Sequence, residues 1–330
     1  MTVSSKSAVV WALGANVVLT VLKGVAFFVS GSGAMLSEAV HSMADSGNQS
    51  LLWVGIRRSE RPADARYPYG YGGERFLFAL LSAVGIFVFG CGVTVYHGVR
   101  SLIEPPELHF GWLTWAVLAT SLVLEGATFF RALEAVKHAK GAQAFRAFLA
   151  SSTDPSALAV LLEDAVAVAG ILVAAAGIGL SAMTGNPLWD ALGSIGIGLM
   201  MGFVALWLAL KNRTLILGRA VPEPVRREAL AFLRAQPCVE KVREVKTRVL
   251  AADRFGLQAD LDFDGRVLGA AEAAWVREQF KKLETQADFE RFAAEFGERI
   301  MQALGREVDR IENELAERLP RIRYIDLEAD

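Results

Sequence analysis

The first 210 residues are dominated by long apolar stretches separated by short polar breaks. A helix that crosses the hydrocarbon core of a bilayer needs about 20 mostly apolar residues. Six stretches are long enough, and we predict one transmembrane helix in each. They are residues 8–29, 34–56, 76–99, 111–133, 156–180 and 188–210. The mean hydropathy of the whole chain is +0.35. The sequence therefore predicts an α-helical integral membrane protein with six transmembrane helices.

Lysine and arginine lie almost entirely on one side of these predicted helices. Residues 57–75, after the second stretch, carry five arginines, and further basic residues follow the fourth and sixth stretches. The alternate loops contain only Arg100. Because cytoplasmic loops are enriched in Lys and Arg, we predict that both termini are cytoplasmic. We expect a bacterial inner (cell) membrane, with the first apolar stretch retained rather than cleaved as a signal peptide.

The remainder of the chain has a different pattern. Residues 214–330 are rich in charge, whereas residues 1–213 form the predicted transmembrane domain. Helical and alternating segments follow one another in the second part. They are a helix over 222–236, strands over 239–251 and 254–265, helices over 269–286 and 288–319, and a strand over 321–330. This α-β-β-α-β order predicts a cytoplasmic α+β domain of the ferredoxin-like type with a long amphipathic helix.

The long helix has an apolar stripe with a helical period. Its members are Phe292, Phe296, Ile300, Leu304, Val308, Ile311, Leu315 and Leu319. The sequence leaves open whether the stripe packs within its own domain or against a second subunit.

Composition excludes several functions. The net charge of −2 gives no indication of a nucleic-acid partner. Cys91 and Cys238 lie in different parts of the chain, so they cannot form a disulfide framework or a four-thiolate metal site. We find no nucleophile–base pair and no H-E-x-x-H element, so we do not predict an enzyme.

Ionisable residues inside the predicted helices are the strongest functional signal, because charge at bilayer depth is costly. His41 and Asp45 are four residues apart in the second stretch, which places them on one helix face. An imidazole nitrogen and a carboxylate oxygen on one face can hold a divalent ion such as zinc. The alternative is a His–Asp hydrogen bond that only ties helices together.

Asp164, in the fifth stretch, has a predicted depth similar to that of Asp45. Three ligands from two helices could then converge and leave a fourth position for water or another side chain. Glu163 is rotated by about 100° from Asp164, which favours a role as a helix contact unless the helix is rotated. Glu125 is a candidate fourth ligand, a proton acceptor or a partner for Lys23.

Lys23 and Glu38 are two further charges in the predicted spans. Lys23 has two interpretations, an ion pair inside the bundle or a role in transport. Glu38 lies near the outer end of the second stretch, where we expect it to be solvated.

Three segments together resemble the cation diffusion facilitator family of divalent-metal/proton exchangers. Residues 30–59, with the element HSMAD at 41–45, are similar to the family's second helix; residues 67–90 and 161–198 are similar to its third, fifth and sixth helices. The resemblance implies a homodimer in the lipid bilayer that exports a divalent cation, with zinc first, in exchange for protons. It also implies that His41, Asp45 and Asp164 are metal ligands.

The chain departs from the family pattern at Val160, four residues before Asp164, where a His or Asp ligand is usual. The LLED segment at 161–164 is similar to the branch of mitochondrial zinc-transporter-like proteins. Loss of one nitrogen ligand makes the site richer in oxygen, so Mn²⁺, Fe²⁺ or Co²⁺ are alternative substrates. Tyr67, Tyr69 and Tyr71 stand where the family often has ligands after helix two, and we predict no second site there.

The predicted cycle is a cation/proton antiport that needs no cofactor. Metal ligands must be deprotonated to coordinate, so proton entry would release the ion. Two alternatives remain open at this stage. The first is a non-transporting regulatory or scaffolding relative disabled by Val160, and the second is a transporter of another solute that uses the acidic residues as a proton relay.

Overall fold

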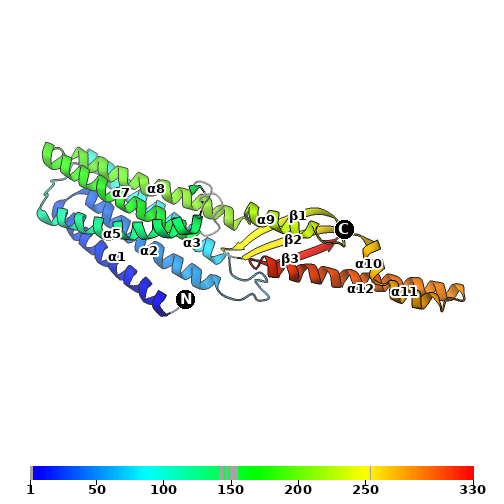
Figure 1. The fold of residues 1–330 in the computed structure, drawn as a ribbon. Coiled ribbons are helices and arrows are strands. Elements are labelled where there is room, and N and C mark those ends of the chain that lie inside the picture. The colour runs from blue at the N-terminus through cyan, green and yellow to red at the C-terminus, as the bar shows by residue number, and fades with distance from the viewer. Residues whose placement is uncertain (1–2, 142–143, 146–147, 149–154, 253) are drawn as a thin grey trace. The chain divides into compact units, whose positions relative to one another are not determined.

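The computed structural model describes residues 3–330 except 142–143, 146–147, 149–154 and 253. The chain divides into two compact units, Met1–Leu217 and Gly218–Asp330, which we describe separately (Figure 1).

The first unit is a bundle of long helices. Each of the six apolar stretches predicted above lies in helical structure. The helices are α1 (Val3–Ser30), α2 (Gly33–Ser59), α3 (Glu74–Gly85), η1 (Ile86–Val93), α4 (Thr94–Ile103), α5 (Trp112–Lys140), α7 (Pro155–Thr184) and α8 (Leu188–Ile216). Figure 1 shows α1, α2, α5, α7 and α8 running side by side as rods. The elements α3, η1 and α4 are consecutive parts of one helical segment, in which η1 is a π-helical stretch.

Four helices in the described residues are long and apolar enough to cross a membrane. They are Glu74–Ile103, Trp112–His138, Ala159–Thr184 and Leu188–Ile216. Asn16–Ser30 of α1 gives a shorter apolar segment. The helix α2 is 27 residues long but carries many polar side chains, and it does not meet the same criterion. The polar face of α2 is the feature that sets it apart from its neighbours.

The N-terminus of α2 is fixed by a buried carboxylate of α8. Asp190 is 1% exposed and accepts hydrogen bonds from Ser32 Oγ at 2.5 Å and from the Gly33 amide at 2.6 Å. A carboxylate is favourable here because the first amides of a helix have no partner within it and carry partial positive charge. This contact fixes where α2, and hence its polar face, begins in the bundle.

The second unit contains a three-stranded sheet and four helices. They are α9 (Glu223–Arg234), β1 (Val239–Ala251), β2 (Arg254–Phe263), α10 (Gly265–Ala271), α11 (Ala273–Phe280), α12 (Gln286–Arg318) and β3 (Ile322–Ala329). The strand order is β1-β2-β3, with β1 antiparallel to β2 and β3 parallel to β2. The predicted hairpin and third strand are present. The single helix predicted over 269–286 is wrong, because α10 ends at Ala271 and α11 ends at Phe280.

The apolar stripe of α12 is buried mainly near its C-terminal end. Ile311 and Leu315 are fully buried, as are Leu233 of α9 and Phe255 of β2. Farther toward the N-terminus, Phe292 stacks on Trp275 of α11, with ring centroids 5.5 Å apart. The stripe therefore contacts its own domain along much of the helix.

Candidate metal site

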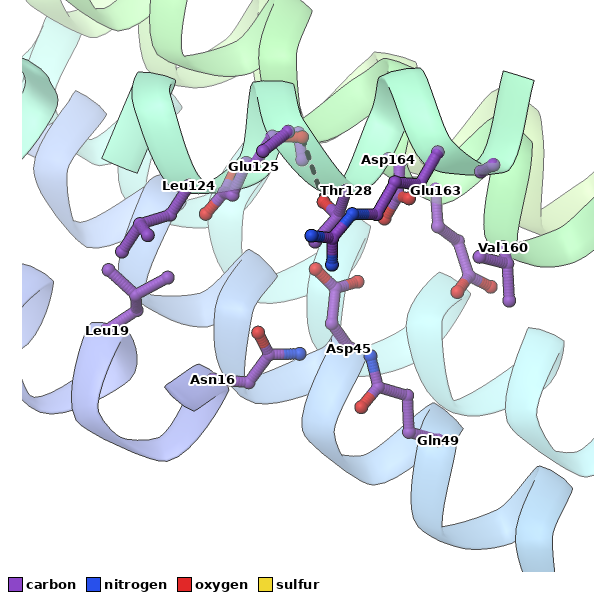
Figure 2. Close-up of a pocket in the computed structure, with 14 residues that line it drawn as sticks. Asn16, Leu19, Asp45, Gln49, Leu124, Glu125, Thr128, Val160, Glu163 and Asp164 are labelled. Carbon is purple, nitrogen blue, oxygen red and sulfur yellow. Dashed lines mark hydrogen bonds between the residues drawn. The ribbon is translucent and has the colours of Figure 1, made fainter. Parts of the chain in front are cut away.

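A cavity of about 610 Å³ lies in the first unit and is lined by α1, α2, α5 and α7. Four carboxylates line it: Asp45 from α2, Glu125 from α5, and Glu163 and Asp164 from α7. Figure 2 shows Asp45 pointing from α2 toward the α5 and α7 residues on the opposite wall. Asn16, Gln49, Thr128 and Arg131 contribute further polar groups. Side chains from four helices, many of them far apart in sequence, thus surround one space.

His41 lies one turn before Asp45 on α2 and is 3% exposed. Its Nε2 is 3.5 Å from Asp45 Oδ2, and His41 is not among the residues that line the cavity. Neither ring nitrogen makes a hydrogen bond to any described residue. The described contacts therefore give no support to a His41 hydrogen bond that ties two helices together.

Asp164 and Glu163 both line the cavity, although successive residues of a helix are rotated by about 100°. Glu163 also has the helix contact expected of it: its Oε2 accepts a hydrogen bond from Asn48 Nδ2, and Asn48 Oδ1 accepts one from Ser82 Oγ. These two hydrogen bonds connect α7, α2 and α3. Asn48 was missed in the sequence, but its spacing of seven from His41 places it on the same face of α2.

Glu125 has the lysine partner that was one of its three predicted roles. Lys23 Nζ lies 2.6 Å from Glu125 Oε1 and 2.8 Å from Glu38 Oε2. The expectation that Glu38 is solvated is wrong, since Glu38 is 0% exposed. The physical reason is the ammonium group of Lys23, which provides an opposite charge inside the bundle and makes burial of the carboxylate possible.

Two sequence departures can be located in the structure. Val160 lines the cavity and is 38% exposed, so an aliphatic side chain occupies this part of the wall. In the loop after α2, the Tyr71 hydroxyl donates a 2.7 Å hydrogen bond to Asp64. This bond holds the pKa of Asp64 below its ordinary value and raises the pKa of Tyr71. Tyr71 therefore stabilises the loop through Asp64.

The predicted ligands lie close to one cavity but do not converge on one point. Among the residues that the structure describes, no group of three or more His, Cys, Asp or Glu side chains is arranged to hold a metal ion. Several buried atoms around the cavity nevertheless make no hydrogen bond to the described residues. They are His41 Nδ1 and Nε2, Glu125 Oε2, Glu163 Oε1 and Asp164 Oδ2. Such atoms are rare in folded proteins and can be satisfied by a bound cation.

Comparison with known proteins gives one family and several relatives. Residues 9–217 match the cation efflux transmembrane domain. The chain is 39% identical over 315 residues to the human "Proton-coupled zinc antiporter SLC30A9, mitochondrial", covering 93% of this chain and 55% of that protein. It is 36% identical over 338 residues to "Metal tolerance protein C4" of Arabidopsis thaliana, covering 98% and 73%. It is 24% identical over 270 residues to "Magnetosome protein MamB" of Paramagnetospirillum magneticum, covering 80% and 84%.

The chain spans about half the length of the zinc antiporters that it matches, 55% of the human protein. Their names place those relatives in mitochondria, which gives no support to the bacterial cell membrane expected from the sequence.

Proposed function

Because this chain belongs to the cation efflux family, we propose that it carries zinc across a membrane in exchange for protons. Family membership makes it a multi-pass integral membrane protein and a transporter, and it confirms the expectation that the chain is not an enzyme. The resemblance to the cation diffusion facilitators is likewise confirmed. Zinc as the cargo and proton antiport are carried over from the names of the relatives.

One observation carries the proposal: buried polar atoms that make no hydrogen bond to the described residues gather around a cavity between four helices. A buried donor or acceptor left unsatisfied costs about 1–3 kcal/mol. Of the described residues, His41, Glu163 and Asp164 all contribute such atoms, and they come from α2 and α7. A divalent cation bound by these groups would satisfy them, which gives the cavity a purpose that packing alone does not.

We assign His41, Asp45 and Asp164 as the ligands of the transported ion. One imidazole nitrogen and two carboxylate oxygens suit Zn²⁺, and the same set also admits Mn²⁺, Fe²⁺ or Co²⁺. Water or Glu163 would complete the coordination, since Val160 cannot. His41 Nε2 is 3.5 Å from Asp45 Oδ2, so these two ligands are already close together. Side-chain rotation would have to bring Asp164 to them.

Proton coupling follows from the chemistry of the ligands. A neutral histidine and ionised carboxylates bind the cation, and protonation of the same atoms lowers its affinity. The same groups therefore hold either the metal or protons. When protons arrive from one side of the membrane, the ion is released on that side. The protonated site then faces the other side again without a bound ion.

We also propose the wider architecture. Residues 1–213 form a six-helix transport domain, residues 214–330 form a cytoplasmic ferredoxin-like domain, and two copies associate as a homodimer. Both termini lie on the cytoplasmic side of the membrane, where most of the Lys and Arg residues of the loops also lie. A helix before the β1–β2 hairpin, helices between β2 and β3, and the parallel pairing of β2 with β3 support the ferredoxin-like assignment.

The test is zinc-driven proton flux in proteoliposomes that contain the full chain. We expect Asp45→Ala, His41→Ala and Asp164→Ala each to abolish the flux. Gln49→Ala is the matched control, because Gln49 lines the same cavity one turn after Asp45 and is not an assigned ligand. Parallel assays with Mn²⁺, Fe²⁺ and Co²⁺ identify the preferred ion. Normal flux in all three ligand variants would show that the site assignment is wrong.

The rival function is a relative that does not transport. One observation favours it: among the described residues, no three His, Cys, Asp or Glu side chains are already arranged to hold a metal ion. Zinc binding to the purified protein distinguishes the two. Stoichiometric binding that Asp45→Ala removes supports the transporter, and its absence in the unmodified protein supports the rival.

A further inference from the structure

The face of α2 that carries His41 and Asp45 also carries Glu38 and Ser42. Glu38 and Asp45 each lie three or four residues from His41 and Ser42, so the four residues share one face of the helix. Lys23 of α1 contacts Glu38 and Ser42 on this face and is 0% exposed. Its ammonium group donates to Glu38 Oε2 at 2.8 Å, to Ser42 Oγ at 2.9 Å and to Glu125 Oε1 at 2.6 Å.

These three contacts use the whole hydrogen-bonding capacity of the ammonium group, which has three donors. One positive charge faces two carboxylates, so the cluster of Lys23, Glu38, Ser42 and Glu125 has a formal charge of −1. Ser42 follows His41 directly in sequence, which places the cluster immediately beside the proposed ligands.

The remaining oxygens of the two carboxylates both make no hydrogen bond to the described residues, but their surroundings differ. Glu38 Oε1 lies against Gly170 of α7: a Cβ at position 170 would be 2.6 Å from this oxygen. Glu125 lines the cavity together with Asp45 and Asp164, and its Oε2 has no hydrogen-bond partner in the described part of the chain (Figure 2). Only Glu125 therefore has a path to a cation in the cavity.

We propose that Lys23 determines the ion specificity of the proposed transport by keeping Glu125 out of the coordination of the metal. The proposal rests on the proposed function. While Lys23 holds Glu125, the cation meets one nitrogen and two carboxylates. If the ammonium group is removed, Glu125 is free to turn toward Asp45 and Asp164 and add a third carboxylate. A site richer in carboxylate oxygen favours Mn²⁺ relative to Zn²⁺.

Calorimetric titration of the purified full chain with Zn²⁺ and with Mn²⁺ tests this inference. Lys23→Met alone leaves two buried carboxylates without a counter-charge, so the informative variant is Lys23→Met with Glu38→Gln. We expect the ratio of Mn²⁺ to Zn²⁺ affinity to rise about tenfold in this double variant, as the ligand set becomes harder. Addition of Glu125→Gln should return the ratio to that of the unmodified protein. Lys23→Arg, which keeps the charge, should shift the ratio less than the double variant does.

Glu125→Gln on its own provides a second test that keeps the Lys23–Glu38 ion pair. The proposal expects less than a threefold change in Zn²⁺ affinity, because Glu125 does not coordinate the ion while Lys23 is present. A loss of tenfold or more would overturn the proposal, and so would an unchanged Mn²⁺/Zn²⁺ ratio in a double variant that still binds Zn²⁺. Failure of the unmodified protein to bind Zn²⁺ through Asp45 would instead contradict the proposed function.

Discussion

The two units of this protein bury carboxylates in different ways. In the second unit Glu272 is 7% exposed, and both of its oxygens are paired, Oε2 with Arg299 at 2.5 Å and Oε1 with Arg306 at 3.3 Å. In the first unit Glu125 and Glu163 each have one paired oxygen and one that makes no hydrogen bond to the described residues. The paired carboxylate stabilises a fold, whereas the half-paired ones retain capacity for a ligand.

Within the first unit the same contrast recurs over a single turn of α2. Ser42 Oγ and Glu38 Oε2 are bonded to Lys23, whereas Glu38 Oε1 and both nitrogens of the His41 ring make no hydrogen bond to the described residues. Removal of a bonded group should therefore affect stability, and removal of an open one should affect binding. The following predictions test this distinction in order of decreasing effect.

Lys23→Met should have the largest effect, and it should be on stability. Removing one partner of a buried ion pair costs about 3–5 kcal/mol, because the remaining charge is left buried without compensation. Here two carboxylates would be left, so we expect a marked fall in the apparent Tm of the detergent-solubilised protein. Lys23→Met with Glu38→Gln should recover much of that loss. A Tm equal to that of the unmodified protein in Lys23→Met would contradict the role given to the cluster.

Asp164→Asn should affect transport and leave stability almost unchanged. Asp164 Oδ2 makes no hydrogen bond to the described residues, so an amide of the same size removes charge without breaking a hydrogen bond at that oxygen. We expect zinc flux to fall about 100-fold, at or above the upper end of the effects seen for outer-shell partners of metals. Zinc flux and Tm measured on the same preparation test this prediction. A large fall in Tm with flux preserved would show that Asp164 contributes to stability rather than to binding.

The sequence allowed prediction of the helices and of part of the site. The helices are readable because the length of an apolar stretch is a local property, and His41 and Asp45 are recognisable as candidates because a spacing of four is also local. The Lys23–Glu125 ion pair could be predicted only as one of three roles for Glu125, because it joins residues 102 positions apart and depends on how α1 meets α5, which no local pattern encodes. Glu38 was misjudged for the same reason, since its distance from a helix end does not reveal the neighbouring lysine.

The second unit shows the same limit on a smaller scale. The hairpin of β1 and β2 follows from alternation and a short turn, and it was predictable. The break between α10 and α11 was not, because the apolar pattern continues across it. Glu272, at that break, pairs with Arg299 and Arg306 of α12, and this contact across the fold lies outside any local period.

Glu272→Ala should have a moderate effect on the second unit. Both arginine partners are substantially exposed, at 40% and 64% of their side chains, so water replaces part of what they lose. We expect a loss of about 1–2 kcal/mol, below the range for a fully buried pair. Chemical denaturation followed by the fluorescence of Trp275, which lies under Arg299, would report it. Zinc flux is the control, since the open carboxylates belong to the other unit.

The smallest effect should appear in the pH dependence of the second unit. Arg310 donates hydrogen bonds to Glu307 and holds the pKa of this carboxyl below its ordinary value of 4.5. A carboxyl with a lowered pKa in the folded state contributes stability above its unfolded pKa, and this contribution is lost as the pH falls through the folded value.

Burial raises the pKa of Glu312, which has the opposite effect and favours the folded state at lower pH. We therefore expect Glu307→Gln to weaken the loss of stability on acidification below pH 4.5. Glu312→Gln should instead remove a gain in stability that accompanies acidification toward pH 4.5 from above. Denaturation midpoints of the two variants on both sides of pH 4.5 distinguish the carboxyl paired with Arg310 from the one that accepts a hydrogen bond from the Leu327 amide, and identical slopes would remove the distinction.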